Sequence, residues 1–285
     1  MTESWRHDYL DTNGIKLHYV TQGEGPLMLM LHGFPACWYS WKYQIPEFAR
    51  HYTVVALDLR GYNDSDRPRK ASAYQLEALI ADIRGAIAAL GYDRCILLGH
   101  DWGGALAWSV AYAHPALVEK LIVMNFPHPA KFAAGLRTPW QLLKSAYILW
   151  FQLPLFPELL LSANNYRGVA ATFADINRYN PDFTTADIDR FRAAASKPGA
   201  IRAMLNYYRN LFEGPISQDE WGRLDVPTCM IWGEGDKAFG KELTYDTERF
   251  VSSLQLQYVP EAAHWVQLDR PDVVNRLVSQ YLGLV

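Results

Sequence analysis

The stretch Gly99–Trp108, GHDWGGALAW, follows the short apolar run Cys95–Leu98 and places an aspartate between glycines. An apolar run that ends in glycine and leads into an alanine-containing stretch predicts a strand, a sharp turn and a helix. Asp101 stands at the centre of G-x-Asp-x-G, where a tight turn lifts the central side chain above the strand. The helix amino terminus behind it stabilises negative charge. The pattern predicts a nucleophile at Asp101, and it leaves open an acidic residue that only caps the helix.

Strand-like and helix-like segments alternate on both sides of this turn. The predicted strands of the first half are Ile15–Thr21, Leu27–Leu31, Tyr52–Leu57, Cys95–Leu98 and Leu121–Asn125. The predicted helices are Tyr74–Leu90 and Gly103–Ala113. Residues 127–222 have a helical composition interrupted by prolines, and two strands, Thr228–Trp232 and Leu254–Val259, and a helix, Pro271–Leu282, follow. This order predicts an α/β protein with a mostly parallel sheet flanked by helices. We expect a core of residues 1–126 and 223–285 with an inserted helical cap, 127–222.

The composition of the 285-residue chain is that of an ordinary globular protein: half of the residues are hydrophobic and a fifth are charged. The formal net charge of −3 gives no reason to expect nucleic acid or an anionic membrane as a partner. The aromatic share of 14% fits an apolar substrate cavity and fits a large core equally well.

Several features bear on where the protein works. The start, MTESWRHDYL, is charged and has no apolar stretch, so we expect no signal peptide. Cys37, Cys95 and Cys229 are odd in number and widely spaced, which indicates reduced thiols in a cytoplasmic protein. The most apolar segment, Tyr147–Leu161, is short and contains two prolines. We therefore expect a buried or interfacial helix pair there and no integral membrane segment.

The loop after the predicted strand Leu27–Leu31 begins His32-Gly-Phe-Pro35. A loop in this place can supply one backbone N–H of an oxyanion hole, here from Phe34, and the second would come from Trp102. Tight loops of this kind sometimes need a cis peptide, which we expect at Phe34–Pro35. His32 is interpreted as structural.

Two further residues follow the late strands. Asp236 lies just past the strand Thr228–Trp232, and His264 lies just past Leu254–Val259. The chain order is therefore nucleophile, acid, histidine, which is the order of α/β-hydrolases. No H-x-x-x-H spacing and no complete G-x-G-x-x-G occurs, so we expect neither a metal nor an organic cofactor.

A carboxylate nucleophile favours attack on a saturated carbon, because it is already ionised at neutral pH. The product is an alkyl ester on Asp101, which water activated by His264 can hydrolyse while Asp236 orients the histidine. The predicted reaction is either epoxide opening or dehalogenation. An epoxide oxygen needs an acid, and tyrosine hydroxyls of the cap could supply it. Spacing alone does not select the acid among 17 tyrosines.

With these motifs, the chain resembles the soluble epoxide hydrolase family of the α/β-hydrolase fold over nearly its whole length. The resemblance rests on His32–Pro35 with Trp38–Trp41 behind it, Gly99–Gly104 and Asn125–Pro129. It implies that Tyr147 and Tyr208 are the paired proton-donating tyrosines. Asn63 stands where the family usually has glycine, and asparagine tolerates the left-handed conformation best after glycine.

The resemblance implies an epoxide hydrolase that takes a small apolar epoxide and water. The sequence leaves the choice between a monomer and a homodimer open. We expect an apolar substrate pocket lined by Trp38, Phe126, Trp150 and Trp265. One alternative is a haloalkane or haloacid dehalogenase, although those relatives lack the tyrosine pair. The other is a non-catalytic ligand-binding protein of the same fold, which would not need five matched polar groups.

Overall fold

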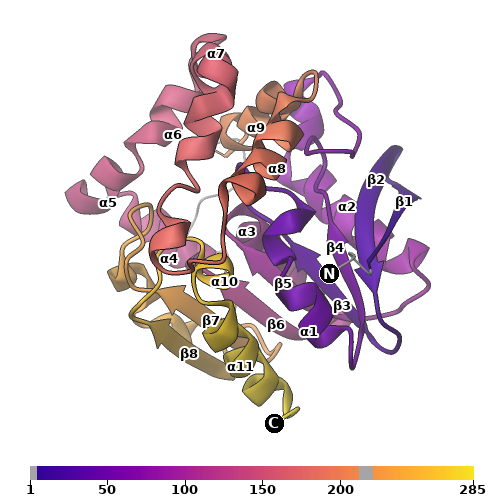
Figure 1. Ribbon diagram of the computed structural model, residues 1–285. Coiled ribbons are helices and arrows are strands. Elements are labelled where there is room, and N and C mark those ends of the chain that lie inside the picture. Colours follow the sequence, from indigo (N-terminus) through magenta and orange to yellow (C-terminus); the bar gives the residue numbers. More distant parts are fainter. Residues whose placement is uncertain (1–4, 212–220) are drawn as a thin grey trace.

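Eight strands form one sheet in the computed structural model, which describes residues 5–211 and 221–285 (Figure 1). The strand order is β1-β2-β4-β3-β5-β6-β7-β8. The pairs β1–β2 and β2–β4 are antiparallel, and all other neighbours are parallel. The strands are β1 Arg6–Thr12, β2 Ile15–Gln22, β3 Leu27–Leu31, β4 Thr53–Leu57, β5 Cys95–His100, β6 Val118–Met124, β7 Thr228–Gly233 and β8 Leu254–Val259.

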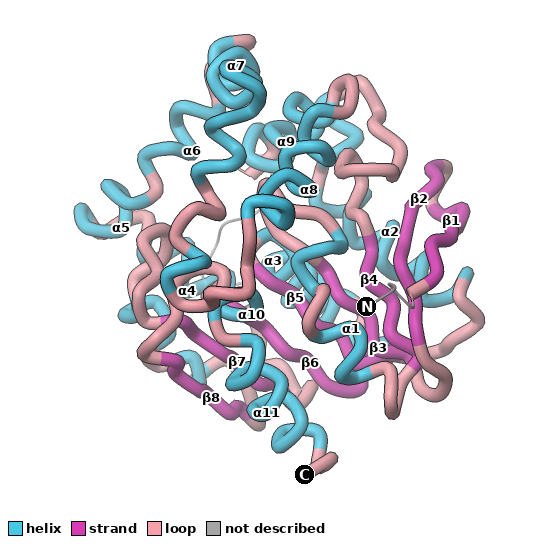
Figure 2. The backbone as a smooth tube through the Cα atoms, in the orientation of Figure 1, coloured by secondary structure: helices cyan, strands magenta, loops and turns pink. Residues whose placement is uncertain are grey.

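Helices cover both faces of this sheet (Figures 1 and 2). On one face α1, Gln44–Phe48, contacts α11, Pro271–Leu282, and on the other α2, Leu76–Ala89, contacts α3, Trp102–Ala113. The central strands β3 and β5 are buried along their full length, as strands covered on both faces must be. The predicted α/β fold, a mostly parallel sheet flanked by helices, is confirmed.

Strand β1 is missing from the sequence-based prediction. Its sequence RHDYLDT is polar, and only Leu10 and Thr12 are buried, because β1 is an edge strand that pairs with β2 alone. Without an apolar alternation, only the backbone hydrogen bonds to β2 define it. The sheet also places β4 between β2 and β3, although a short glycine-containing turn joins β2 to β3 in sequence.

The segment between β6 and β7 contains helices and no strand in its described part, and it lies over the end of the sheet where β5 runs into α3 (Figure 1). The helices are α4 Pro129–Gly135, α5 Pro139–Lys144, α6 Ala146–Phe151, α7 Phe156–Ala171, α8 Thr185–Ser196 and α9 Ala200–Arg209. Residues 212–220 of the predicted cap lie outside the described residues. Among those described, no helix combines the length and apolar character needed to cross a bilayer.

Candidate active site

The turn between β5 and α3 holds Asp101 in a strained conformation, with φ 52° and ψ −122°. Neighbouring glycines make the turn possible. A Cβ atom on Gly99 would overlap the carbonyl oxygen of Gly103, and one on Gly103 would overlap the carbonyl oxygen of Leu31. The turn therefore packs backbone directly against backbone and lifts the Asp101 side chain off the end of β5.

Replacing Gly103 by Ala tests this packing. Since the neighbour is main chain and cannot rotate away, we expect the free energy of unfolding to fall by about 3 kcal/mol or more. Chemical denaturation measures the change. Gly222→Ala is the matched control, because a Cβ atom there has no heavy atom within 4 Å, and we expect a change below about 1 kcal/mol. Equal stability of Gly103→Ala and the wild type would contradict the close packing.

Backbone N–H groups meet the Asp101 carboxylate. The Phe34 N–H donates to Asp101 Oδ1 at 2.7 Å, and the Trp102 N–H also hydrogen-bonds to this carboxylate. The Phe34–Pro35 peptide is cis, as predicted. His32 is fully buried, and its Nε2 accepts a hydrogen bond from the Leu59 N–H at 3.1 Å, so it ties two loops together. The two N–H groups predicted for an oxyanion hole are thus both directed at Asp101.

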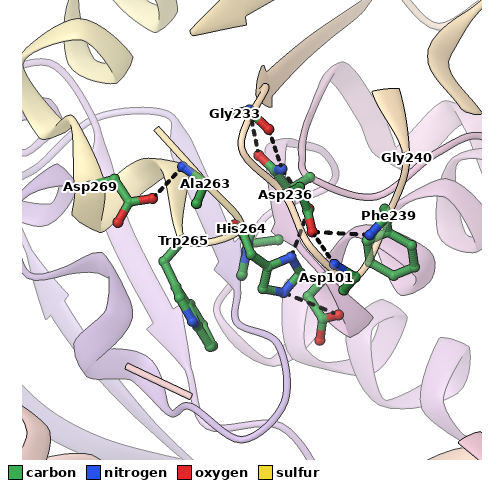
Figure 3. Close-up of polar contacts among 12 residues, drawn as sticks. Asp101, Gly233, Asp236, Phe239, Gly240, Ala263, His264, Trp265 and Asp269 are labelled. Atoms are coloured by element: carbon green, nitrogen blue, oxygen red, sulfur yellow. Dashed lines mark hydrogen bonds and ion pairs between the residues drawn. The ribbon is translucent and has the colours of Figure 1, made fainter. Parts of the chain in front are cut away.

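His264 lies between two carboxylates (Figure 3). Its Nδ1 is 2.9 Å from Asp236 Oδ2, and its Nε2 is 3.7 Å from Asp101 Oδ2. Asp236 Oδ1 accepts from the N–H groups of Ala238 and Phe239, at 2.7 and 3.0 Å. The loops after β5, β7 and β8 therefore bring the three predicted residues together.

The electrostatics of the three groups follow from their surroundings. Burial raises the pKa of Asp101, although His264 and the two N–H groups oppose the shift. Burial acts in the same direction on Asp236, but His264 and the surrounding hydrogen bonds outweigh it and lower the pKa of Asp236. Burial disfavours the His264 imidazolium, yet Asp236 and then Asp101 raise the pKa of His264 to about 9. Asp236 is therefore a fixed anion, and His264 responds to the charge of Asp101.

Two tyrosines lie beside this site. Tyr147 comes from α6 and Tyr208 from α9; their ring centroids are 6.0 Å apart, and their side chains share a hydrogen bond. The Tyr208 ring packs edge-on against Trp102 and Phe34. Burial is the main cause that raises the pKa of both phenols; the charge of Asp101 comes next for Tyr147, whereas for Tyr208 the neighbouring Tyr147 comes before Asp101. Both hydroxyls therefore keep their protons at neutral pH.

Comparisons with known proteins point to one family. A family model described as the alpha/beta hydrolase fold matches residues 26–271. Epoxide hydrolase 4 of Homo sapiens is 44% identical over 279 residues, which cover 95% of this chain and 76% of the human protein. The chain belongs to the epoxide hydrolase family of the alpha/beta hydrolase fold.

A solved structure and a further sequence relative agree with this assignment. A crystal structure of Bacillus megaterium epoxide hydrolase in complex with an inhibitor has a TM-score of 0.91 and 35% sequence identity, covering 97% of this chain and 100% of that chain. The AB hydrolase superfamily protein YfhM of Bacillus subtilis is 42% identical over 279 residues, covering 96% of either chain. The predicted family is confirmed.

Trp150 does not occupy the position expected of a pocket residue in an epoxide hydrolase. It is 52% exposed, and its ring packs on Phe156. The neighbouring residue Phe151 lies inside instead, against Tyr147, Phe34 and Tyr208. Phe151, four residues after Tyr147, shares the inner face of α6 with it, while Trp150 is turned outward. The prediction for Trp150 is corrected accordingly.

The other predicted pocket aromatics lie in three different places. Trp38 is buried against Trp5, His7 and Tyr39, on the side of the sheet near β1. Trp265 packs on the His264 ring, and its Nε1 donates to the Thr172 carbonyl. Trp102 and Phe126 line a cavity of about 460 Å³, together with residues of α2, α3, α4 and α9. Their role as one substrate pocket stays a prediction.

Three residues that support the site were not predicted. Asn125 Nδ2 donates to Asp236 Oδ2 at 2.7 Å, and Asn125 Oδ1 accepts from the Gly233 N–H. His100 Nε2 donates to the His264 carbonyl oxygen at 2.7 Å. Asp269 accepts from the Ala263 N–H at 2.7 Å, and burial raises the pKa of Asp269 to about 7. His100 ends β5 and Asn125 directly follows β6, the strand next to β5. A polar residue at the end of such a strand is the signal that could have identified both.

One group of side chains away from this site has the composition of a metal site. Ligand atoms of His18, Asp58 and Asp64 lie within 4.8 Å of one another. His18 Nδ1 hydrogen-bonds Asp58 at 2.6 Å, Asn63 Nδ2 also donates to Asp58, and Lys197 pairs with Asp64. These groups satisfy one another, and Asn63 has the left-handed φ of 41° that was expected.

Proposed function

We propose that the chain hydrolyses a small apolar epoxide to a vicinal diol, with Asp101 as nucleophile, His264 as base and Asp236 as the acid that orients it. The observation that carries the proposal is the pair of protonated phenols, Tyr147 and Tyr208, next to a desolvated carboxylate. An epoxide oxygen becomes an alkoxide as its ring opens, so it needs such an acid. A halide leaving group needs no proton.

The geometry supports an ester intermediate. Asp101 Oδ1 is held by the Phe34 N–H, which leaves Oδ2 to attack the epoxide carbon. One C–O bond forms and the ring C–O bond breaks, while a tyrosine gives its proton to the departing oxygen. Asp101 thereby loses its charge, and the pKa of His264 must fall, because that charge helps to raise it. A neutral His264 can then accept a proton from water.

In the second half of the reaction, water adds to the ester carbonyl carbon and His264 Nε2 takes its proton. The negative charge develops on the Asp101 carboxyl group, to which the Phe34 and Trp102 N–H groups donate hydrogen bonds. Collapse of this intermediate breaks the bond to the diol oxygen, which takes the proton from His264. The tyrosinate takes up the proton that His264 released on ester formation, and the second proton of the water passes from the Asp101 carboxyl group to His264, which restores the starting state. We propose that helices α4–α9 act as a cap that keeps bulk water from the reacting groups.

The tyrosine pair can be tested by the double substitution Tyr147→Phe and Tyr208→Phe. Removing both acids should lower diol formation by about two to four orders of magnitude. Tyr207→Phe is the matched control: Tyr207 is the next residue on α9, but its hydroxyl donates to the Arg60 carbonyl oxygen instead. Steady-state kinetics on a styrene-type epoxide measure the effect. Retained activity in the double variant would place the acid elsewhere.

The reaction class is tested with a panel of terminal, aryl and fatty-acid epoxides beside haloalkanes. We expect diol from an epoxide and no halide release. A variant of the Bacillus megaterium enzyme was crystallised with its product, a naphthyloxy-propane-diol, so aryl ether epoxides belong in the panel. Halide release would favour the dehalogenase. Tight ligand binding without turnover would favour a binding protein.

We also propose a cytoplasmic location, supported by three buried cysteines that form no disulfide. The choice between monomer and homodimer stays a prediction, and light scattering on the purified chain measures it.

A further inference from the structure

A concentrated apolar surface lies on the outside of helices α5–α7, away from the proposed catalytic residues. Ten of the thirteen exposed large apolar side chains of the described residues fall within residues 140–160. Leu143 is 71% exposed and Leu159 is 68% exposed. We call this surface the apolar patch, and its most exposed members are Trp140, Leu143, Leu149, Leu155, Leu159 and Leu160. Exposed apolar residues gathered in this way mark an interaction surface.

The apolar patch is held in place by the helix behind it. The Arg209 guanidinium donates to the carbonyl oxygens of Phe151 and Leu153 and pairs with Glu158. These contacts fasten the link between α6 and α7 to α9. Within this link Leu155 has a positive φ of 64°, which is strained for leucine, and its side chain still points into solvent. The chain therefore presents apolar side chains outward on a fixed backbone.

The charges around the patch are basic. Residues 127–160 contain three basic residues, Lys131, Arg137 and Lys144, and one acid, Glu158. Glu158 pairs with Arg209 and Lys131 pairs with Asp246, so Arg137 and Lys144 carry the local positive charge. Arg137 is exposed at the start of the patch, and the Lys144 ammonium lies over the Trp140 ring. Leucine and tryptophan beside lysine and arginine are the composition of helices that lie in an anionic membrane surface. The local charge is opposite to the net charge of the chain, which gave no reason to expect a membrane.

We propose that the apolar patch docks onto the surface of a bilayer that contains anionic lipid. A second copy of the chain fits less well, because the same surface on both sides of a two-fold contact would offer Arg137 and Lys144 no acid from residues 127–160 except Glu158, which already pairs with Arg209. Figure 1 shows α5, α6 and the start of α7 along the outer edge of the molecule, where a flat bilayer can reach them without contacting the sheet.

Docking would place the membrane against the helix that carries Tyr147. Leu149 and Trp150 are on the exposed side of α6, while Tyr147 and Phe151 of the same helix face Tyr208. An apolar epoxide partitions into lipid, so a docked enzyme would take it from the bilayer next to its site. This last consequence rests on the proposed function, whereas the docking itself does not.

Flotation of the full-length chain with vesicles tests the proposal. Vesicles of phosphatidylcholine alone are compared with vesicles that also contain phosphatidylglycerol, at low and high salt. We expect the chain to float with the anionic vesicles, and less so at high salt. The triple variant Leu143→Ser, Leu149→Ser and Leu159→Ser should lower the bound fraction by about tenfold or more. The double variant Tyr9→Ser and Tyr245→Ser, which changes half-exposed large side chains elsewhere, should bind like the wild type.

A thermal melt of each variant shows whether it is folded. If the triple variant does not fold, the double variant Arg137→Glu with Lys144→Glu replaces it. This double variant should abolish the preference for anionic vesicles. Four results would overturn the proposal: no flotation, flotation that the patch variants keep, equal flotation with neutral vesicles, or a concentration-dependent dimer that the triple variant dissolves. Binding and diol formation are separate measurements, so a chain that floats without turnover refutes only the proposed function, and the reverse result refutes only the docking.

Discussion

Asp101→Asn is expected to lower diol formation by about four orders of magnitude or more, because a neutral amide is a poor nucleophile. Asparagine keeps the size of the side chain, and it adopts a positive φ readily, so the strained turn should survive. Asp246→Asn, which changes a half-exposed carboxylate that pairs with Lys131 of α4, is the matched control. Steady-state kinetics measure both variants, and normal diol yield from Asp101→Asn would refute the nucleophile.

The same variant has a second readout. The Asp101 charge helps to raise the pKa of His264 to about 9, so its removal should move that pKa downward. A histidine NMR titration of both proteins measures the shift. A pKa of His264 that stays unchanged would show that Asp236 alone sets it, and the proposed coupling between ester formation and proton release would be wrong.

A single turnover in heavy-oxygen water distinguishes an ester from direct attack by water. With enzyme in excess over epoxide, the water oxygen should enter the Asp101 carboxyl group, since water attacks the ester carbonyl carbon. Mass spectrometry of the Asp101 peptide detects the label. Label found in the diol of the first turnover, with none in the protein, would rule out the ester.

His264→Gln should have the second large effect, and of a different kind. Asp101 can still attack the epoxide, but no base activates water, so the ester accumulates while turnover falls by about three orders of magnitude or more. The intact protein mass should increase by the mass of the substrate. His51→Gln, on an exposed histidine, should show neither effect. An unmodified protein mass in inactive His264→Gln would contradict the two-step scheme.

Local chemistry made part of the site predictable. Gly99 and Gly103 are needed wherever backbone packs on backbone at a strand end, so the nucleophile turn can be read from ten residues. Asp236 and His264 were predicted because each follows a strand of a parallel sheet, and the carboxyl ends of such strands meet at one edge. The hydrogen-bond network agrees with this placement, while the catalytic roles await the experiments above.

Two features could not be predicted in the same way: which side chains of a helix face the site, and whether a polar segment pairs as an edge strand. Tyr147 and Tyr208 could be selected only by resemblance, because many tyrosines in a helical segment share the same local pattern. Phe151 and Trp150 are adjacent and equally apolar, yet one packs on Tyr147 and the other faces solvent. Strand β1 carries no apolar alternation, so only its partner β2 reveals it.

The sequence by itself determined the alternation of strands and helices, the glycine turn around Asp101 and the chain order of Asp101, Asp236 and His264. Each of these features can be read from a short local pattern of residues. The tertiary structure decided which side chains share one dry site: it joined Asn125 to Asp236, turned Phe151 inward and left the apolar patch uncovered. The physical reason is that burial and charge coupling arise between segments that are far apart in the chain. No local pattern contains the orientation of one packed helix against another.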